Sequence, residues 1–255
     1  MTLVLIISAC AFVALIATGV HYFVHKRMRT AILEPYNEVT AAVYATFGVL
    51  YAVILGLLVS HGQTRRDVVM TSSVREAAML VDVAQAARTF GPGPADSVRT
   101  ACLVYADHVR SIEWNISSND TPPLHQHRHF DAIWEVVRRI DPVGPRQEGI
   151  YLSMLDVLGK MSEERYERLA ATGDHMSLFL KVVLLLGAAV TVAFLWFFGM
   201  NDNRIHLAYT WLVTLMLSLV LVLIFALDNP MQIGVGVHPI AYERAIYDLN
   251  GMASN

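Results

Sequence analysis

Four long apolar stretches divide the sequence, two near the N-terminus and two in the last third of the chain. They cover residues 3–24, 39–60, 176–199 and 205–227. A helix needs about 20 apolar residues to cross the hydrocarbon core of a bilayer, so each stretch is long enough to span it once. The pattern predicts an all-α membrane protein with four transmembrane helices in two hairpins. The basic run His25-Lys26-Arg27 follows the first stretch, which we interpret as a retained anchor and not a cleaved signal peptide.

The polar segment between the hairpins is long enough to form a helical aqueous subdomain of its own. Arg65 and Arg66 mark where the chain leaves the membrane, yet neither proline nor glycine follows until Gly91. The second span is therefore predicted to continue as one long helix into the subdomain. Further helices are expected from Ala95, over 130–140 and over 147–172, the last leading directly into the third span, with 115–126 as a loop. The predicted divisions are hairpin one (1–62), the helical aqueous subdomain (63–175), hairpin two (176–228) and a C-terminal tail (229–255).

Composition supports a bilayer as the solvent of this chain. Hydrophobic residues make up 55% and charged residues 16%, and the mean hydropathy is +0.46. Soluble domains carry roughly 25% charged residues. The net charge of −3 leaves no basic face, which argues against a nucleic-acid partner.

Small residues recur at helical spacing along one side of the second span. At 100° per residue they fall on one narrow face, a pattern that lets helix backbones approach closely in a membrane. This predicted packing ridge consists of Ala41, Ala45, Gly48, Ala52 and Gly56.

Bulky side chains follow a different side of the same span and carry the candidate site. They include Phe47, Tyr51, Ile54 and Leu58. Such a stripe either faces lipid or, in a ring of subunits, faces the axis and forms a hydrophobic constriction of the kind that gates by dewetting. Periodicity alone leaves both interpretations open.

Ionisable residues lie at the ends of the spans, among them His21, Lys181 and His206. Buried carboxylates or histidines inside the spans would be needed for a proton relay, so the pattern disfavours an ion-driven pump and leaves a passive pore. The histidine-rich run 125–129, with His108 upstream, lacks the cysteines and the fixed spacing of a zinc site, and we interpret it as a solvated loop. We expect no metal, no cofactor and no enzymatic activity, because no nucleophile motif and no phosphate-binding loop is present.

Several motifs together resemble a bacterial family described as bestrophin-like. They are Tyr36-Asn37-Glu38-Val39, Gly48-Val49-Leu50-Tyr51-Ala52-Val53, Arg165 to Leu169, Phe197-Phe198-Gly199 and Leu227-Asp228-Asn229-Pro230. Bestrophins are pentameric anion channels with an apolar neck on the second span, so the resemblance implies a homo-oligomer in a bacterial inner membrane with Phe47, Tyr51, Ile54 and Leu58 in its neck. The tail departs from bestrophins, since Asp228, Glu243 and Asp248 are its only acids and form no evident calcium-binding cluster.

Two questions stay open at this stage. Lys26, Arg27, Arg29 and Arg204 lie in the short loops, and by the positive-inside rule these loops are cytoplasmic; the resemblance places the long insert there instead. The leading hypothesis for function is an oligomeric channel that passes small anions. The alternative is a non-conducting membrane scaffold or accessory subunit whose helical insert binds a partner protein.

Overall fold

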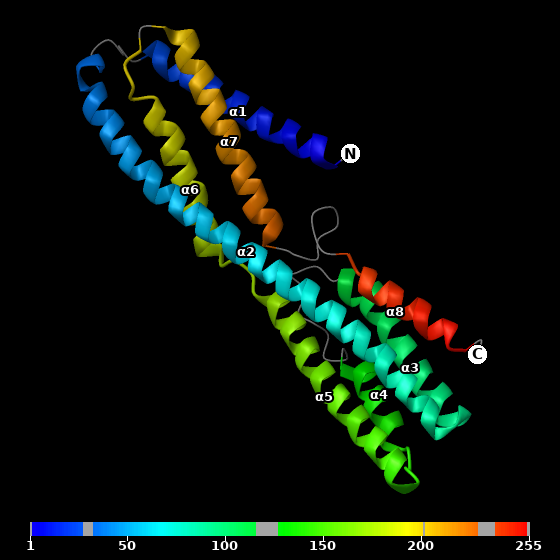
Figure 1. Cartoon of the computed structure of the whole chain (residues 1–255). Coiled ribbons are helices and arrows are strands. Elements are labelled where there is room, and N and C mark those ends of the chain that lie inside the picture. Colours follow the sequence, from blue (N-terminus) through cyan, green and yellow to red (C-terminus); the bar gives the residue numbers. More distant parts are fainter. Residues whose placement is uncertain (1, 28–32, 116–126, 201, 229–237, 254–255) are drawn as a thin grey trace. The chain divides into compact units, whose positions relative to one another are not determined.

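The computed structural model describes residues 2–27, 33–115, 127–200, 202–228 and 238–253, and the regular elements within these ranges are all helical (Figure 1). In chain order the α-helices are α1 (Thr2–Arg27), α2 (Asn37–Ala87), α3 (Pro92–Ser111), α4 (His127–Arg138), α5 (Gly144–Gly173), α6 (Leu178–Leu195), α7 (Asn203–Leu227) and α8 (Ile240–Gly251). Short 3-10 turns precede or follow α2 and α3, at Glu34–Tyr36, Arg88–Phe90 and Glu113–Asn115. The expectation of an all-α protein is confirmed.

The chain divides into two compact units. The membrane unit consists of Met1–Gln63 and Met176–Asp228, and the aqueous unit of Thr64–His175 and Asn229–Asn255. The membrane unit contains four helical stretches long and apolar enough to span a bilayer, as the hydrophobic pattern predicted. Helix α2 belongs to both units, because it runs unbroken for 51 residues. Its predicted continuation as one unbroken helix is confirmed, and the chain turns after it at Gly91, whose φ of 99° favours glycine.

Within the membrane unit, α1 packs along α7 and α6 packs against α7 (Figure 1). A small apolar core joins α2 to α6 and α7, through Tyr51, Leu55, Leu184, Leu221 and Ile224. No more than 28% of the most apolar window of any span is buried within the chain. Most of the apolar surface of this unit is therefore left for lipid or for other copies.

The predicted continuity between the last helix of the insert and the third span is wrong. Helix α5 ends at Gly173, and Asp174 leaves the helical conformation with ψ of 85°. Helix α6 then begins afresh at Leu178, where the Ser177 side chain accepts a hydrogen bond from the Leu180 amide at 3.3 Å. A serine cap of this kind starts a new helix because it satisfies an amide that has no partner in the first turn. Only α2 joins the two units as a continuous helix.

The aqueous unit has a larger core of fully buried side chains, drawn from α2, α3, α4, α5 and α8. No helix was predicted for the tail from the sequence, yet α8 lies there and packs on α3. Its buried residues Tyr242, Ala245 and Leu249 recur at helical spacing, which is the signal that could have identified it. The ring of Tyr242 meets that of Trp114 edge to face, with centroids 5.9 Å apart.

Paired charges also lie in the interior of the aqueous unit. The guanidinium of Arg168 contacts the Glu76 carboxylate at 2.8 Å and that of Glu113 at 2.9 Å, and Arg165 contacts Glu113 at 3.1 Å. The Tyr105 hydroxyl donates to Glu76. Burial alone would lower the pKa of Arg168, but the nearby carboxylates raise it well above its ordinary value, so the side chain stays charged. These contacts tie α5 to α2 and to the turn after α3.

Candidate functional site

The membrane half of α2, residues 37–63, carries the candidate site, and one of its sides is engaged within the chain. The Tyr51 ring is 7% exposed, and its hydroxyl donates a hydrogen bond to the Leu184 carbonyl of α6 at 2.7 Å. Phe47 stacks on Tyr51, with ring centroids 6.4 Å apart. The engaged side of α2 is thus held on α6 by Tyr51, and Phe47 packs on the Tyr51 ring.

Gly187 explains how α2 and α6 approach so closely. A Cβ at this position would lie 2.5 Å from Cε2 of Tyr51, which is closer than a carbon pair tolerates. Glycine therefore leaves the space on α6 that the Tyr51 ring fills, and the same contact brings the hydroxyl to Leu184.

The four residues predicted to line a pore occupy different environments in the single chain. Tyr51 is buried in the apolar core and Leu58 packs against that core. Phe47 is half-buried, and Ile54 is 43% exposed. The stripe therefore runs from the engaged side of α2, at Tyr51, to the open side, at Ile54. Beyond Ile54 the open side continues with exposed apolar residues, namely Val43, Val49, Leu50, Val53 and Leu57.

The predicted packing ridge is not covered by another helix of the same chain. Ala41, Ala45, Ala52 and Gly56 are exposed and Gly48 is half-buried. A Cβ added at Gly48 or at Gly56 would meet no atom within 4 Å outside its own helix turn. Gly48 and Ala52 also border an apolar cavity of about 280 Å³ between α2, α6 and α7. The ridge is thus free to receive a helix from outside the chain.

Side-chain contacts, here called brackets, connect segments of the chain at the two ends of the membrane unit. At the start of α2, the Asn37 side chain donates to the Gly199 carbonyl at 2.7 Å and accepts from the Gly199 amide at 2.8 Å. At the other end, the Asp228 carboxylate accepts from the Met176 amide at 2.7 Å and pairs with Lys181 at 2.8 Å. The first bracket joins the start of α2 to the segment after α6, and the second joins the residue after α7 to the start of α6.

Comparison with known proteins identifies the relatives of this chain. A profile of the Bestrophin-like domain matches residues 11–242.

The chain belongs to the bestrophin-like family.

Solved structures with the same fold include a bacterial Bestrophin homolog from Klebsiella pneumoniae. One mutant form is 12% identical, covers 100% of both chains and gives a TM-score of 0.72. A second mutant form is 10% identical, covers 98% of this chain and 97% of that one, and gives 0.77. A comparison with curated proteins gives no match. At such low identity the structural likeness establishes the fold of this bestrophin-like chain, while its activity has to be argued from its own residues.

The motifs that resemble the family fall largely on contacts that hold the bestrophin-like fold together. Asn37, Gly199 and Asp228 form the two brackets, and Arg165 and Arg168 form the buried ion pairs of the aqueous unit. Neither contact was deduced from the sequence, because each joins residues that are far apart along the chain. These motifs therefore indicate residues that stabilise the fold, and they do not by themselves identify a functional group.

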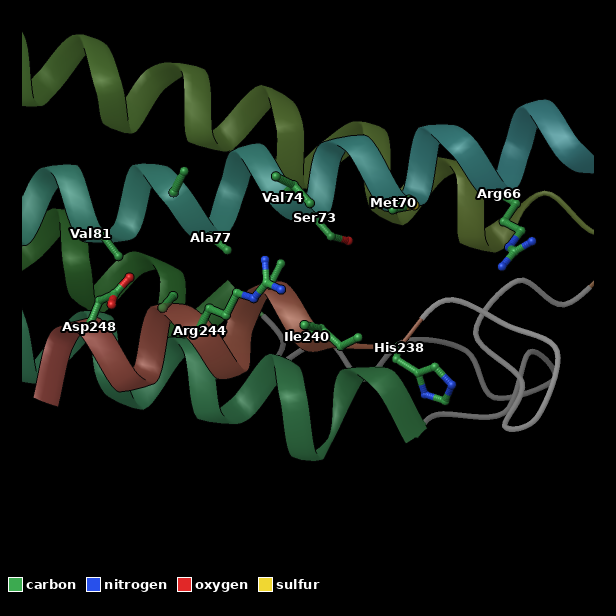
Figure 2. Close-up of a pocket in the computed structure, with 13 residues that line it drawn as sticks. Arg66, Met70, Ser73, Val74, Ala77, Val81, His238, Ile240, Arg244 and Asp248 are labelled. Atoms are coloured by element: carbon green, nitrogen blue, oxygen red, sulfur yellow. The ribbon is translucent and has the colours of Figure 1, made fainter.

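A cavity of about 470 Å³ in the aqueous unit lies between α2 and α8 (Figure 2). Arg66 from α2 and Arg244 from α8 line it, with Asp248 at one end and His238 at the other. Two guanidinium groups against one carboxylate make this cavity electrostatically unfavourable for a cation. The acids of the tail thus do not assemble a cation site among these lining residues.

Part of the histidine-rich run 125–129, namely His125 and Gln126, lies outside the described residues. Of the others, His108 and His129 bring their rings to 4.4 Å between centroids. Burial lowers the pKa of His108 below its ordinary value, although the Glu113 carboxylate opposes this shift. Among the described residues, the groups close enough together to hold a metal ion do not include this pair of rings.

Proposed function

We propose that this protein assembles into an oligomeric ion channel in which the membrane halves of the α2 helices surround the water path. The observation that supports this most is the division of α2 into an engaged side and an open side. The engaged side packs on α6 through Tyr51, and the open side exposes Ile54, Leu50 and Leu57. A helix with one side anchored can present the other side to a symmetry axis without loss of its own packing.

The small-residue ridge supplies the contact between copies in this proposal. Gly48 and Gly56 have no neighbour within 4 Å of an added Cβ, so a helix of an adjacent copy can approach the α2 backbone. Close approach of this kind stabilises membrane helices, which gain little from hydrophobic burial against lipid. Five copies and a bacterial inner membrane are the arrangement that the family resemblance favours.

The neck of the channel is proposed to consist of Phe47, Tyr51, Ile54 and Leu58. Ile54 is the exposed member and would face the axis, with Phe47 and Leu58 beside it. Tyr51 would support the neck from behind, since its hydroxyl is engaged by Leu184. An apolar ring is a barrier because an ion sheds hydration there and receives no polar group in exchange. We propose small anions as the permeant class, on the family resemblance.

Ion flux from liposomes that contain only the purified protein tests this function. We expect chloride efflux that exceeds that of protein-free liposomes, and a higher rate for Ile54→Ala, which widens the neck. Leu186→Ala is the matched control, because Leu186 is 59% exposed on α6 and lies outside the proposed neck. Absence of flux in wild type and in Ile54→Ala would favour the alternative, a scaffold whose aqueous unit binds a partner protein.

A further inference from the structure

Three histidines meet at one end of the membrane unit. His21 and His25 lie one helical turn apart on α1, and His206 lies in the first turn of α7. One ring nitrogen from each lies within 4.8 Å of the other two. The rings of His21 and His206 stand nearly perpendicular, with centroids 4.3 Å apart. Two histidines at positions i and i+4 of a helix present their rings on the same face, as in helical zinc sites.

The hydrogen bonds of His21 assign the proton on its ring. Thr210 donates its hydroxyl proton to the His206 carbonyl at 3.1 Å, so its oxygen is left to accept from Nδ1 of His21 at 2.7 Å. The proton of a neutral His21 is therefore on Nδ1, and its Nε2 carries a lone pair. That Nε2 is buried and has no hydrogen-bond partner.

The same reasoning applies to His206. Its Nε2 lies 2.8 Å from the Leu195 carbonyl, and a carbonyl can only accept, so Nε2 carries the proton. The lone pair is then on Nδ1, which is also buried without a hydrogen-bond partner. The side chains of His21 and His206 are 0% and 2% exposed. The cluster thus contains two buried lone pairs, one on His21 and one on His206. On each ring the other nitrogen donates its proton to an oxygen outside the cluster, that of Thr210 or that of Leu195.

Lone pairs in this arrangement cannot satisfy each other, because neither nitrogen carries a proton. A buried polar atom without a partner costs about 1–3 kcal/mol, and a divalent cation would satisfy both nitrogens at once. Outer acceptors that orient ring tautomers are a regular feature of histidine metal ligands. Imidazole is a ligand that suits zinc, copper and nickel.

We propose that His21, His25 and His206 bind one divalent transition-metal ion of the zinc class. Nitrogens bound to a tetrahedral zinc ion at about 2.0–2.1 Å lie about 3.4 Å from one another, so a small inward movement of the rings completes the site. The fourth position is left to water or to an anion. The ion joins α1 to α7, and it does so near the ends of both helices, where an aqueous route from the short loops is shortest.

Titration of the purified, full-length protein without a histidine tag tests this site. After treatment with a chelator, we expect one zinc ion per chain by calorimetry, and one cobalt(II) ion with the visible absorption of nitrogen coordination. His21→Gln and His206→Gln should abolish saturable binding. Thr210→Val keeps the shape of the side chain but removes the acceptor for His21, and should lower the affinity by about 10–100-fold.

The double variant His108→Gln and His129→Gln is the control, since it removes the other close pair of rings and should bind zinc as wild type does. Zinc should also raise the melting temperature of wild type and of this control, but not that of His206→Gln. The proposal is overturned if wild type binds no zinc at micromolar concentration, if His206→Gln or Thr210→Val binds as tightly as wild type, or if the control loses the site. If wild type binds no zinc and keeps the same melting temperature with and without the metal, a proton or a water molecule between the rings satisfies the buried nitrogens instead.

Discussion

The two units of this protein bury polar groups in opposite ways. In the aqueous unit, Arg168 lies between the carboxylates of Glu76 and Glu113, and the opposite charges meet inside one continuous core. In the membrane unit, two buried imidazoles of one histidine cluster each keep a ring nitrogen without a hydrogen-bond partner, and most of the apolar surface of the spans is exposed. The aqueous unit thus neutralises its most deeply buried charges within its own core. The membrane unit needs lipid, further copies and, by our proposal, a metal ion to complete its contacts.

The largest effect is expected from breaking the paired charges. Arg168→Met leaves Glu76 buried without its guanidinium partner and leaves Glu113 paired with Arg165 alone, which should destabilise the fold by about 3–5 kcal/mol. Arg75→Met is the control, because the Arg75–Glu164 pair involves a side chain that is 60% exposed and should contribute no more than about 1 kcal/mol. Thermal unfolding in detergent measures both. Equal melting temperatures for the two variants would show that the aqueous unit does not depend on this network.

A substitution on the open ridge should act on assembly and not on the fold of the single chain. Gly48→Leu meets no atom of its own chain near the new Cβ, but should overpack each contact between copies, at a cost of about 1–3 kcal/mol per contact. We expect a smaller particle by size-exclusion chromatography with light scattering, with helical content unchanged. A particle of wild-type mass would mean that lipid, and not another copy, covers the ridge.

Gly187 should show the opposite behaviour, because its space is already filled by Tyr51. Gly187→Ala places a Cβ against the Tyr51 ring and should cost about 1–3 kcal/mol, with the same mass of the assembly once folded. Gly48→Ala is the matched control and should not destabilise, since alanine favours a helix over glycine. The melting temperatures of the two variants distinguish a helix face that packs within the chain from one that does not. A Gly187→Ala protein as stable as Gly48→Ala would contradict the tight contact.

The smallest effect concerns pH and the aqueous unit alone. Because burial lowers the pKa of His108, the unfolded chain binds a proton there more readily than the folded chain. The contribution of His108 to stability is therefore present above its ordinary pKa and is lost as the pH falls through it. His108→Gln should flatten the change in melting temperature between about pH 5.5 and about pH 7.5. An unchanged pH dependence in the variant would assign the titration to other groups.

The sequence predicted the elements better than their contacts. Four spans followed from apolar length, and the unbroken α2 followed from the absence of proline and glycine before Gly91. The face of α2 that packs within the chain could not be predicted, because it depends on the space that Gly187 leaves for Tyr51 on another helix. The cluster of His21 and His206 was missed for the same reason, since its members are distant in sequence and each resembles an isolated residue at the end of a span.

Chemical modification at position 54 tests the central claim, that the open side of α2 borders the water path of an assembly. The native cysteines should react little with a thiol reagent, because Cys10 and Cys102 are buried and burial raises the pKa of Cys102 to about 12. In liposomes we expect a water-soluble methanethiosulfonate reagent to change the chloride flux of Ile54→Cys and to leave that of Leu186→Cys unchanged. If Ile54→Cys conducts but does not respond to the reagent, Ile54 faces lipid and the proposed neck is wrong.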